Sequence, residues 1–279
     1  MKKVILIGEV LWDIIDGSRH IGGAPVNCAL NLASLGTESW IVSSVGEDEP
    51  GRAAINYLKT NGVKTDLIKM NPNEKTGVAQ VIHDGEINSF VLSTPAAYDF
   101  PTLDKNDVVF EPDVIVFGTL ASFRSKQTFQ TIETAVHYFP KALKFLDVNL
   151  RAPFFDRETV EKLISVCDIL KCNDEESQIL SEMMFQKKLD IPSWGRQMID
   201  RFGCKCVIVT CGAAGAVAIM GNGCYYSPGY KANVIDTVGA GDAFSAGFLN
   251  TYLSRQRIAD ALYDGCHQGS KCVSHTGAF

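Results

Sequence analysis

Short apolar segments that end in a glycine or a polar residue recur along this chain and alternate with segments of helical pattern. Residues 4–8, 114–118 and 144–149 are three of them, and a helix is predicted across residues 126–138. A short, continuous apolar run is typical of a parallel strand that is buried on both faces. Strands that alternate with helices form a parallel sheet with helices on both faces. The pattern therefore predicts a doubly wound α/β fold with a mainly parallel sheet.

The alternation is interrupted between residues 76 and 98, where two β-rich segments follow each other. Residues 77–83 and 89–93 are joined through Asp84-Gly85, a typical hairpin turn. A hairpin inside an alternating chain indicates a small sheet apart from the main one. The alternative is that these strands lie at the edge of the main sheet. No repeat or Pro/Ser-rich linker divides the chain, so we expect residues 1–279 to form a single domain.

Composition limits the class of partner. The 279 residues are 46% hydrophobic and 21% charged, which is ordinary for a globular protein. The net charge of −6 comes without a long basic run, which argues against nucleic acid as the main partner. No segment approaches the roughly 20 apolar residues that span a bilayer. Glu9 and Asp13 interrupt the apolar start before it reaches the length of a signal peptide. We predict a cytoplasmic protein without a membrane partner.

The cysteines and histidines give little support for a metal centre. The nine cysteines include no C-x-x-C pair, and the five histidines include no H-x-x-x-H. A structural zinc site needs such spacings. The prediction is a set of reduced, mostly buried thiols.

A glycine-rich stretch near the C-terminus has the pattern of an anion site. Gly239, Ala240 and Gly241 precede a segment with helical spacing, so a helix should begin close to Asp242. The glycines let the backbone turn its N–H groups toward a ligand, and a helix N-terminus attracts phosphate. A carboxylate there is suited to take a proton from a hydroxyl that attacks a phosphoryl group. The alternative is a glycine turn with Asp242 as a helix cap.

A second polar group lies near the N-terminus. Asp13 follows the first predicted strand, and Gly22, Gly23 and Asn27 lead into a helical segment. The two glycines permit close approach of another backbone. The Asn27 amide both donates and accepts hydrogen bonds, which suits a sugar with vicinal hydroxyls. The alternatives are that Asn27 only caps the helix and that Asp13 is a solvated turn residue.

Two stretches resemble the signatures of the PfkB (ribokinase-like) carbohydrate kinases. Asp236-Thr-Val-Gly-Ala-Gly-Asp242 resembles the C-terminal signature, and Gly22-Gly-Ala-Pro-Val-Asn27 resembles the N-terminal one. The resemblance implies phosphoryl transfer from ATP, with Asp242 as catalytic base and an anion hole of Gly239, Ala240 and Gly241. It also implies that the sugar binds to Asp13, Gly22, Gly23 and Asn27. Residues of about 14–21 and 76–98 would form a lid over the sugar, and lid strands in this family often pair as homodimers.

Further motifs resemble the nucleotide and metal side of this family. Thr210-Cys-Gly-Ala-Ala-Gly215 is similar to a loop that meets ATP phosphates, and Asn173-Asp-Glu-Glu176 to a motif that organises Mg²⁺ largely through water. The resemblance assigns these nucleotide-side residues: Asn173, Thr210, Gly212, Gly215, Thr237 and Arg151. It places a K⁺ loop, in relatives that use K⁺, around Asp236. The alternatives are a helix cap at Asn173 and, for Arg151, a surface ion pair.

The prediction of the sugar depends on differences at single positions and in short segments. Ribokinases carry Asn where this chain has Leu11, which argues against ribose. The 22–25, 147–151 and 171–176 segments look closer to bacterial fructokinases. We therefore predict fructose, with other PfkB kinase substrates (2-keto-3-deoxygluconate, ribose or a nucleoside) as alternatives. A non-catalytic regulator that binds sugar or nucleotide is a further alternative, against which the intact Asp242 counts. A dinucleotide oxidoreductase and a P-loop kinase lack their glycine fingerprints here.

Overall fold

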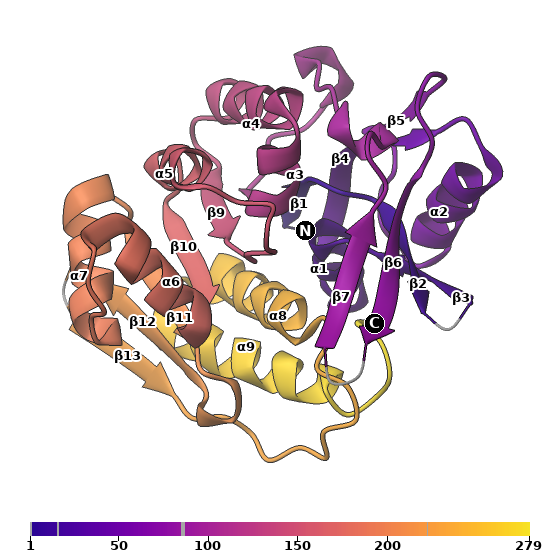
Figure 1. Cartoon of the computed structure of the whole chain (residues 1–279). Helices are drawn as coiled ribbons and strands as arrows, with labels where there is room; N and C mark the ends of the chain where they lie inside the picture. Colours follow the sequence, from indigo (N-terminus) through magenta and orange to yellow (C-terminus); the bar gives the residue numbers. More distant parts are fainter. Residues whose placement is uncertain (1, 16, 85–86, 222) are drawn as a thin grey trace.

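A computed structural model describes residues 2–15, 17–84, 87–221 and 223–279. The main sheet within these residues consists of β1 (Lys3–Ile7), β4 (Glu38–Gly46), β5 (Ile68–Asn71), β8 (Val114–Gly118), β9 (Leu143–Asp147), β10 (Ile169–Asn173), β11 (Cys206–Thr210), β12 (Ala216–Met220) and β13 (Gly223–Ser227). Their spatial order is β13-β12-β11-β10-β9-β8-β1-β4-β5 (Figure 1). Neighbours from β5 to β11 pair in parallel, and β12 pairs antiparallel with both β11 and β13. The sheet is therefore mainly parallel, as predicted.

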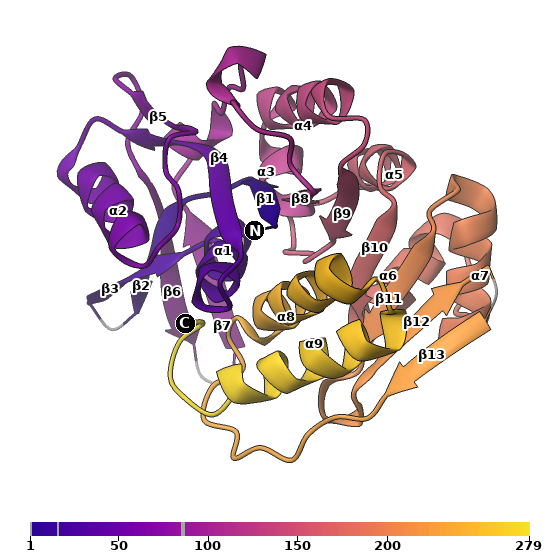
Figure 2. The same ribbon diagram turned by 180° about the vertical axis from the view of Figure 1, so that it is seen from behind.

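Helices cover both faces of this sheet. One face carries α1 (Ala24–Ser34), α2 (Glu49–Thr60), α8 (Ala240–Arg255) and α9 (Ile258–Cys272). Of these, α8 and α9 lie in front in Figure 2. The other face carries α3 (Thr119–Arg124), α4 (Lys126–Tyr138), α5 (Arg157–Ser165), α6 (Asp174–Phe185) and α7 (Ile191–Phe202). The two faces have separate hydrophobic cores. This arrangement confirms the predicted doubly wound α/β fold.

The inner strands are largely apolar because they supply both cores. Side chains alternate across a strand, so neighbours point to opposite faces of the sheet. Val4 and Leu6 of β1 lie in the core under α1 and α8, and Ile5 and Ile7 lie in the core under α4. The same alternation points Asp147 of β9 and Lys171 of β10 to the face that α1, α2, α8 and α9 cover.

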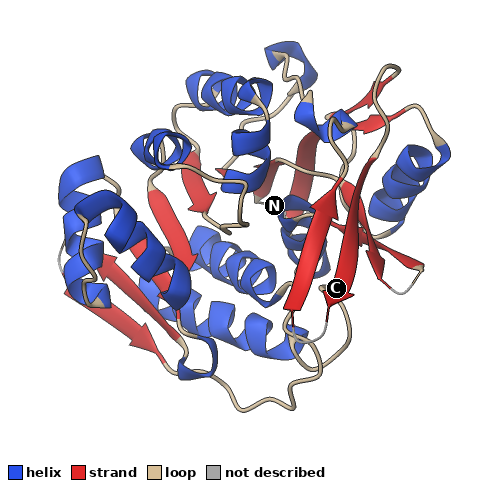
Figure 3. Cartoon of the chain, in the orientation of Figure 1, coloured by secondary structure: helices blue, strands red, loops and turns tan. Residues whose placement is uncertain are grey.

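A second sheet stands apart from the main one. It consists of β2 (Leu11–Ile15), β3 (Ser18–Gly22), β6 (Gly77–Asp84) and β7 (Ile87–Leu92), in the order β3-β2-β6-β7. Figure 3 shows these strands together on the right side of the molecule, and they pair with one another rather than with the main sheet. The alternative of edge strands in the main sheet is therefore wrong. The predicted turn at Asp84-Gly85 falls partly outside the described residues, since Gly85 is not among them.

Two more expectations concern helices and thiols. Among the described residues, no helix combines the length and the apolar character needed to cross a bilayer. All nine cysteines are described and are free thiols, and most of them are buried.

Candidate active site

The turn into α8 presents backbone amides beside a carboxylate. Gly239 has φ 76°, and a Cβ atom there would overlap Ala278, so the turn requires glycine. The helix begins at Ala240, and Asp242 lies in its first turn. The residue that caps α8 is Gly239, so the interpretation of Asp242 as a cap is wrong. The N–H groups of Gly241 and Asp242 belong to the first turn, where no acceptor inside the helix is available.

Unlike the N–H groups of Gly241 and Asp242, the N–H group of Ala240 has a hydrogen-bond partner in the turn. Its N–H donates to the carbonyl oxygen of Thr237 at 3.3 Å. An amide of the predicted anion hole is therefore partnered within its own loop in this structure. For Ala240 to bind an anion, this long hydrogen bond must open.

Asp242 is joined to the N-terminal polar group by a hydrogen bond. The Asn27 side-chain amide donates to the Asp242 carboxylate across 2.9 Å, between residues that are 215 positions apart in the chain. The contact forms because α1 packs against α8. Asn27 lies in the second turn of α1, whose cap is Gly23, so the interpretation of Asn27 as a helix cap is wrong. Its amide is aimed at the predicted base instead.

The environment of Asp242 favours its neutral form. Burial raises the pKa of Asp242 to about 7, and the nearby negative charge of Asp147 adds to this. The hydrogen bond from Asn27 and the positive charges of Lys171 and Arg151 act in the opposite direction and lower the pKa. A carboxylate that titrates near neutral pH is suited to exchange protons with a hydroxyl.

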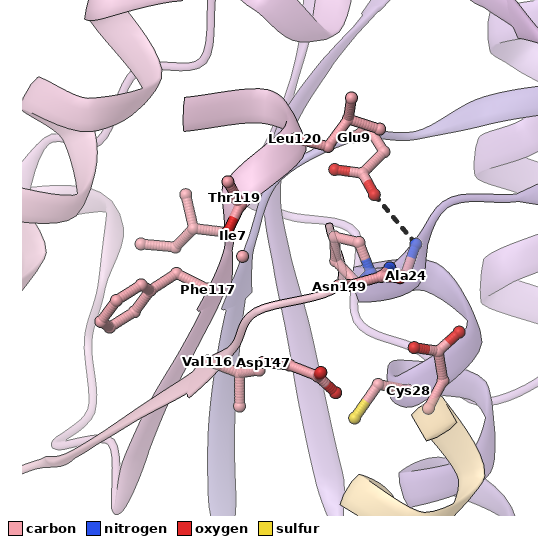
Figure 4. A pocket seen from close by; sticks show the side chains of 13 residues that line it. Ile7, Glu9, Ala24, Cys28, Val116, Phe117, Thr119, Leu120, Asp147 and Asn149 are labelled. Atoms are coloured by element: carbon pink, nitrogen blue, oxygen red, sulfur yellow. Dashed lines mark hydrogen bonds between the residues drawn. The ribbon is translucent and has the colours of Figure 1, made fainter. Parts of the chain in front are cut away.

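A cavity opens at the carboxyl ends of β1, β8 and β9 (Figure 4). Such strand ends are where open α/β sheets place ligands. Glu9, which is 5% exposed, accepts a hydrogen bond from the Ala24 N–H at 3.0 Å, and Figure 4 draws this bond. Burial raises the pKa of Glu9, and its backbone hydrogen bonds oppose the shift. The residues that line the cavity are Ile7, Glu9, Ala24, Pro25, Cys28, Val116, Phe117, Gly118, Thr119, Leu120, Asp147, Asn149 and Asp242.

The other predicted sugar ligands come from the small sheet and the start of α1. Asp13 lies inside β2, so the interpretation of Asp13 as a solvated turn residue is wrong. Burial raises the pKa of Asp13 to about 6, against the positive charges of His20 and Arg151. Gly22 ends β3 beside the Asp13 carboxylate. Gly23 follows with φ 109°, packed so closely on the Glu9 carbonyl that a Cβ would overlap it.

Arg151 lies within electrostatic range of three of these carboxylates. Its positive charge lowers the pKa of Glu9, Asp13 and Asp242. The guanidinium therefore lies near the carboxylates of Glu9, Asp13 and Asp242. Its side chain is exposed.

The predicted nucleotide-side residues gather at neighbouring strand ends. Asn173 ends β10 and lies opposite Thr210, which ends β11. Gly212 and Gly215 belong to the loop that follows, where the Cys211 N–H donates to the Gly215 carbonyl at 2.7 Å. Thr237 lies in the turn before α8. These positions are far apart in sequence but share one edge of the sheet.

Glu176 is held by backbone amides on both sides. One of its carboxylate oxygens accepts from the Leu150 N–H at 2.7 Å and the other from the Asn173 N–H at 2.8 Å. Asn173 caps α6 and accepts from the Glu176 N–H at 2.7 Å. Asn173 therefore makes the contacts of a helix cap, as the alternative interpretation of the sequence predicted. Since each oxygen already accepts a hydrogen bond, this carboxylate fits contact with Mg²⁺ through water better than direct coordination. The described residues contain no group of three or more metal-ligating side chains.

Asp236 ties the anion loop to the C-terminal tail. Its carboxylate accepts from the Val238 N–H at 3.0 Å and from the Gly277 N–H at 2.9 Å. Burial works against the charge of Asp236, but these backbone hydrogen bonds outweigh it and lower the pKa. Asn31 adds a 3.2 Å hydrogen bond to the Ala278 carbonyl. The segment around Asp236, where the K⁺ loop is predicted, is therefore adjacent to the C-terminal tail.

The sequence interpretation missed an ion pair beneath the α8 turn. The Lys171 ammonium lies 2.9 and 3.0 Å from the two Asp147 carboxylate oxygens, and Ser245 donates to Asp147 at 2.7 Å. In the sequence, Lys171 and Asp147 stand out only as members of family-like stretches, and Ser245 has no predicted role. A lysine inside an apolar strand was the available signal, because a buried charge needs a partner.

Comparison with known proteins places this site in a family. The family model for pfkB carbohydrate kinases matches residues 5–279. The chain belongs to the PfkB family of carbohydrate kinases. As a member, this PfkB kinase is an ATP-dependent phosphotransferase that acts on sugars.

Three relatives show how far the similarity extends. A putative sugar kinase of Pyrococcus horikoshii is 30% identical over 262 residues, which cover 87% of this chain and 80% of that protein. The fructokinase of Vibrio alginolyticus is 27% identical over 263 residues, which cover 89% and 83%. The crystal structure of a fructokinase double mutant from Vibrio cholerae O395, with fructose, ADP and potassium ion bound, matches with a TM-score of 0.86. That match is 26% identical and covers 100% of this chain and 94% of the other. The PfkB kinase therefore has the ribokinase-like fold.

Proposed function

We propose that this PfkB kinase transfers the γ-phosphoryl group of ATP to a hydroxyl of fructose. The observation that carries the proposal is the 2.9 Å hydrogen bond between Asn27 and Asp242 at the N-terminus of α8. It brings a group that recognises hydroxyls together with a group that removes their proton, beside amides that attract phosphate. Fructose is favoured by Leu11, which replaces the Asn of ribokinases, and by fructokinases among the relatives.

The chemistry is carried by Asp242 and the turn before it. The ionised Asp242 carboxylate accepts the proton of the attacking hydroxyl as the new O–P bond forms. The amides of Gly239, Ala240 and Gly241 stabilise negative charge on the transferred group. Ala240 joins them once its hydrogen bond to Thr237 opens. Asp13, Gly22, Gly23 and Asn27 hold the sugar in position for attack.

The phosphates of ATP bind along the neighbouring strand ends. We assign them to Asn173, Thr210, Gly212, Gly215, Thr237 and Arg151. Glu176 and Asn173 would hold Mg²⁺ through water, and the bound ion would supply positive charge to the phosphate oxygens. Asp236 and the adjoining tail form a K⁺ loop, supported by the close packing of the two segments.

The remaining assignments concern the whole chain. The small sheet acts as a lid on a single domain, and its closure over the sugar excludes water and limits ATP hydrolysis. We further assign homodimer formation to this sheet and a cytoplasmic location to the protein. Size-exclusion chromatography with light scattering tests the dimer, since a monomer at micromolar concentration would contradict it.

The substrate assignment is tested by coupled ADP release with ATP and Mg²⁺ against fructose, ribose, 2-keto-3-deoxygluconate and adenosine. Turnover with fructose at a kcat/KM at least tenfold above the others is expected. Preference for another member of the panel would overturn fructose and keep the mechanism. No turnover with any of them, in protein that binds ATP, would favour the regulatory alternative. Chelation of Mg²⁺ and replacement of K⁺ by Na⁺ in the same assay test the two cation assignments.

A further inference from the structure

A buried charge cluster lies directly beneath the anion-binding turn. Lys171 and Asp147 are 5% and 7% exposed; Lys171 lies in the middle of β10, and Asp147 is the last residue of β9. Both side chains point to the face that α8 covers, because they alternate with Leu170 and Leu146, which lie in the opposite core. Figure 4 shows the Asp147 side chain at the cavity beside Cys28. The cluster therefore adjoins the cavity through Asp147, although none of its residues is a sugar or nucleotide ligand in the proposed function.

The cluster converges on one carbonyl group. The Lys171 ammonium donates to the Gly241 carbonyl oxygen at 3.3 Å. The Ser245 hydroxyl, which is fully buried, lies 3.0 Å from the same oxygen and 2.7 Å from Asp147. A hydroxyl has one proton, so Ser245 serves these two acceptors one at a time, whereas the ammonium has three protons for its acceptors. A Cβ at Gly241 would come within 3.0 Å of the ammonium, which shows how closely the charge underlies the turn.

That carbonyl belongs to the peptide group whose N–H is the Asp242 amide. A peptide group is planar, so holding its oxygen also sets the direction of its N–H. We infer that Lys171, Asp147 and Ser245 are positioning residues, which hold the Gly241 carbonyl and thereby orient the Asp242 N–H and the backbone that carries the Asp242 carboxylate for phosphoryl transfer. The inference rests on the proposed function, since it gives the proposed base a rigid support.

Stability is a poor explanation for this cluster. Removing two charges from water is costly for each ion, and buried ion pairs can often be replaced by apolar residues without loss of stability. A lysine at this position therefore contributes more through orientation than through stability. Displacing a catalytic group by about 1 Å can lower a rate by roughly 10²-fold.

The electrostatic surroundings of Asp242 provide a second readout. The charged and titratable groups that act on it are Asp147, Lys171, Arg151 and the thiols of Cys28 and Cys272. Asp147 raises the pKa of Asp242, and Lys171 lowers it. Replacing Asp147 by Asn leaves the ammonium without its closest counter-charge, so the titration of Asp242 should move to lower pH.

Three variants test the inference. Lys171→Met is expected to lower kcat by about 10²-fold, and Ser245→Ala by about tenfold for one weakened hydrogen bond. The KM values for sugar and ATP should change by less than about threefold, because the loss falls on the transition state. Lys205→Met is the control for the loss of a lysine–carboxylate pair away from the site, since its exposed ammonium pairs with Asp168 at 2.9 Å at the opposite end of the strands. The control should keep its activity.

Asp147→Asn tests whether the charges of the cluster act on Asp242. The carboxyl ¹³C signal of Asp242, assigned by its loss in Asp242→Asn, should titrate at lower pH in Asp147→Asn than in the wild type. This measurement needs no turnover, so it remains valid even if no sugar is phosphorylated and the proposed function fails. An unchanged titration, or a Ser245→Ala variant with the kcat of the wild type, would overturn the inference. If Lys171→Met does not fold, the other two variants still decide.

Discussion

At the residue scale, the proposed function depends on two residues that lie far apart in the sequence. Asn27 and Asp242 meet in a 2.9 Å hydrogen bond, and burial with the charge of Asp147 raises the pKa of Asp242 to about 7. Asn27 and the positive charges of Lys171 and Arg151 keep the shift from being larger. The carboxylate is thus balanced between its two protonation states near neutral pH.

Replacing Asp242 by Asn should nearly abolish turnover. The amide keeps the size of the side chain but accepts no proton, and general base catalysis contributes about 10²–10⁴-fold. Steady-state kcat is the measurement, and ATP affinity from calorimetry is the control, which should change little. A variant with near-wild-type kcat would contradict the role of Asp242 as base.

The pH profile of kcat/KM should fall as the pH drops below about 7. The base works only when ionised, and kcat/KM reports groups of the free enzyme. Asn27→Ala removes a hydrogen bond that favours the ionised form, so its profile should shift to higher pH. The titration of ATP is the same in both assays, so the difference between the profiles reports the enzyme. Coinciding profiles would show that the hydrogen bond does not act on the base.

At the element scale, two helix starts position the site in different ways. The turn before α8 leaves first-turn amides for an anion, whereas the start of α6 is closed by the reciprocal hydrogen bonds of Asn173 and Glu176. Glu176 also receives the Leu150 N–H, next to Arg151. It therefore connects the loop after β9 to the first turn of α6.

Glu176→Ala should destabilise the fold even without Mg²⁺. The change removes the cap contact and leaves the buried Leu150 N–H without its acceptor, which together cost about 2–3 kcal/mol in the free energy of unfolding. Glu175→Ala, in the same turn but exposed, is the control and should stay within about 0.5 kcal/mol of the wild type. Chemical denaturation measures both. Equal stability of the two variants would mean that Glu176 serves the metal alone.

At the scale of the whole molecule, the site weakens the fold near neutral pH. Burial raises the pKa of four carboxyl groups there: Glu9, Asp13, Glu176 and Asp242. In the unfolded chain these groups ionise near pH 4. Between pH 4 and the higher pKa values of the folded protein, the folded state therefore binds more protons than the unfolded state. Stability should therefore decrease as the pH rises through this range.

Lowering the pH from 7.5 to 5.5 should accordingly raise the melting temperature, by roughly 2–4 °C for each kcal/mol gained. Asp13, with a pKa of about 6, and Asp242, with a pKa of about 7, titrate inside this window. The double variant Asp13→Asn/Asp242→Asn should show a flatter dependence. Asp48 and Asp236, whose pKa values are lowered, matter only below about pH 4, where their contribution is lost. A melting temperature that falls between pH 7.5 and 5.5 would contradict the assignment.

The sequence alone determined the fold class, the family and the glycine turns. Apolar runs such as residues 4–8 favour a strand buried on both faces, and the turn at Gly239, with φ 76°, requires a residue without a Cβ. These requirements are local, because each one depends only on residues that are consecutive in the sequence. For the same reason the sequence predicted a helix close to Asp242 but also allowed Asp242, Asn27 and Asp13 to be cap or turn residues.

Only the tertiary structure decided which side chains meet. The alternation along β9 and β10 turns Asp147 and Lys171 toward α8, and the packing of α1 on α8 brings Asn27 to Asp242. Contacts between residues 24 to 215 positions apart leave no local pattern. Burial, which sets the pKa of Asp242, is likewise a property of the packed molecule, because it depends on how many neighbours exclude water.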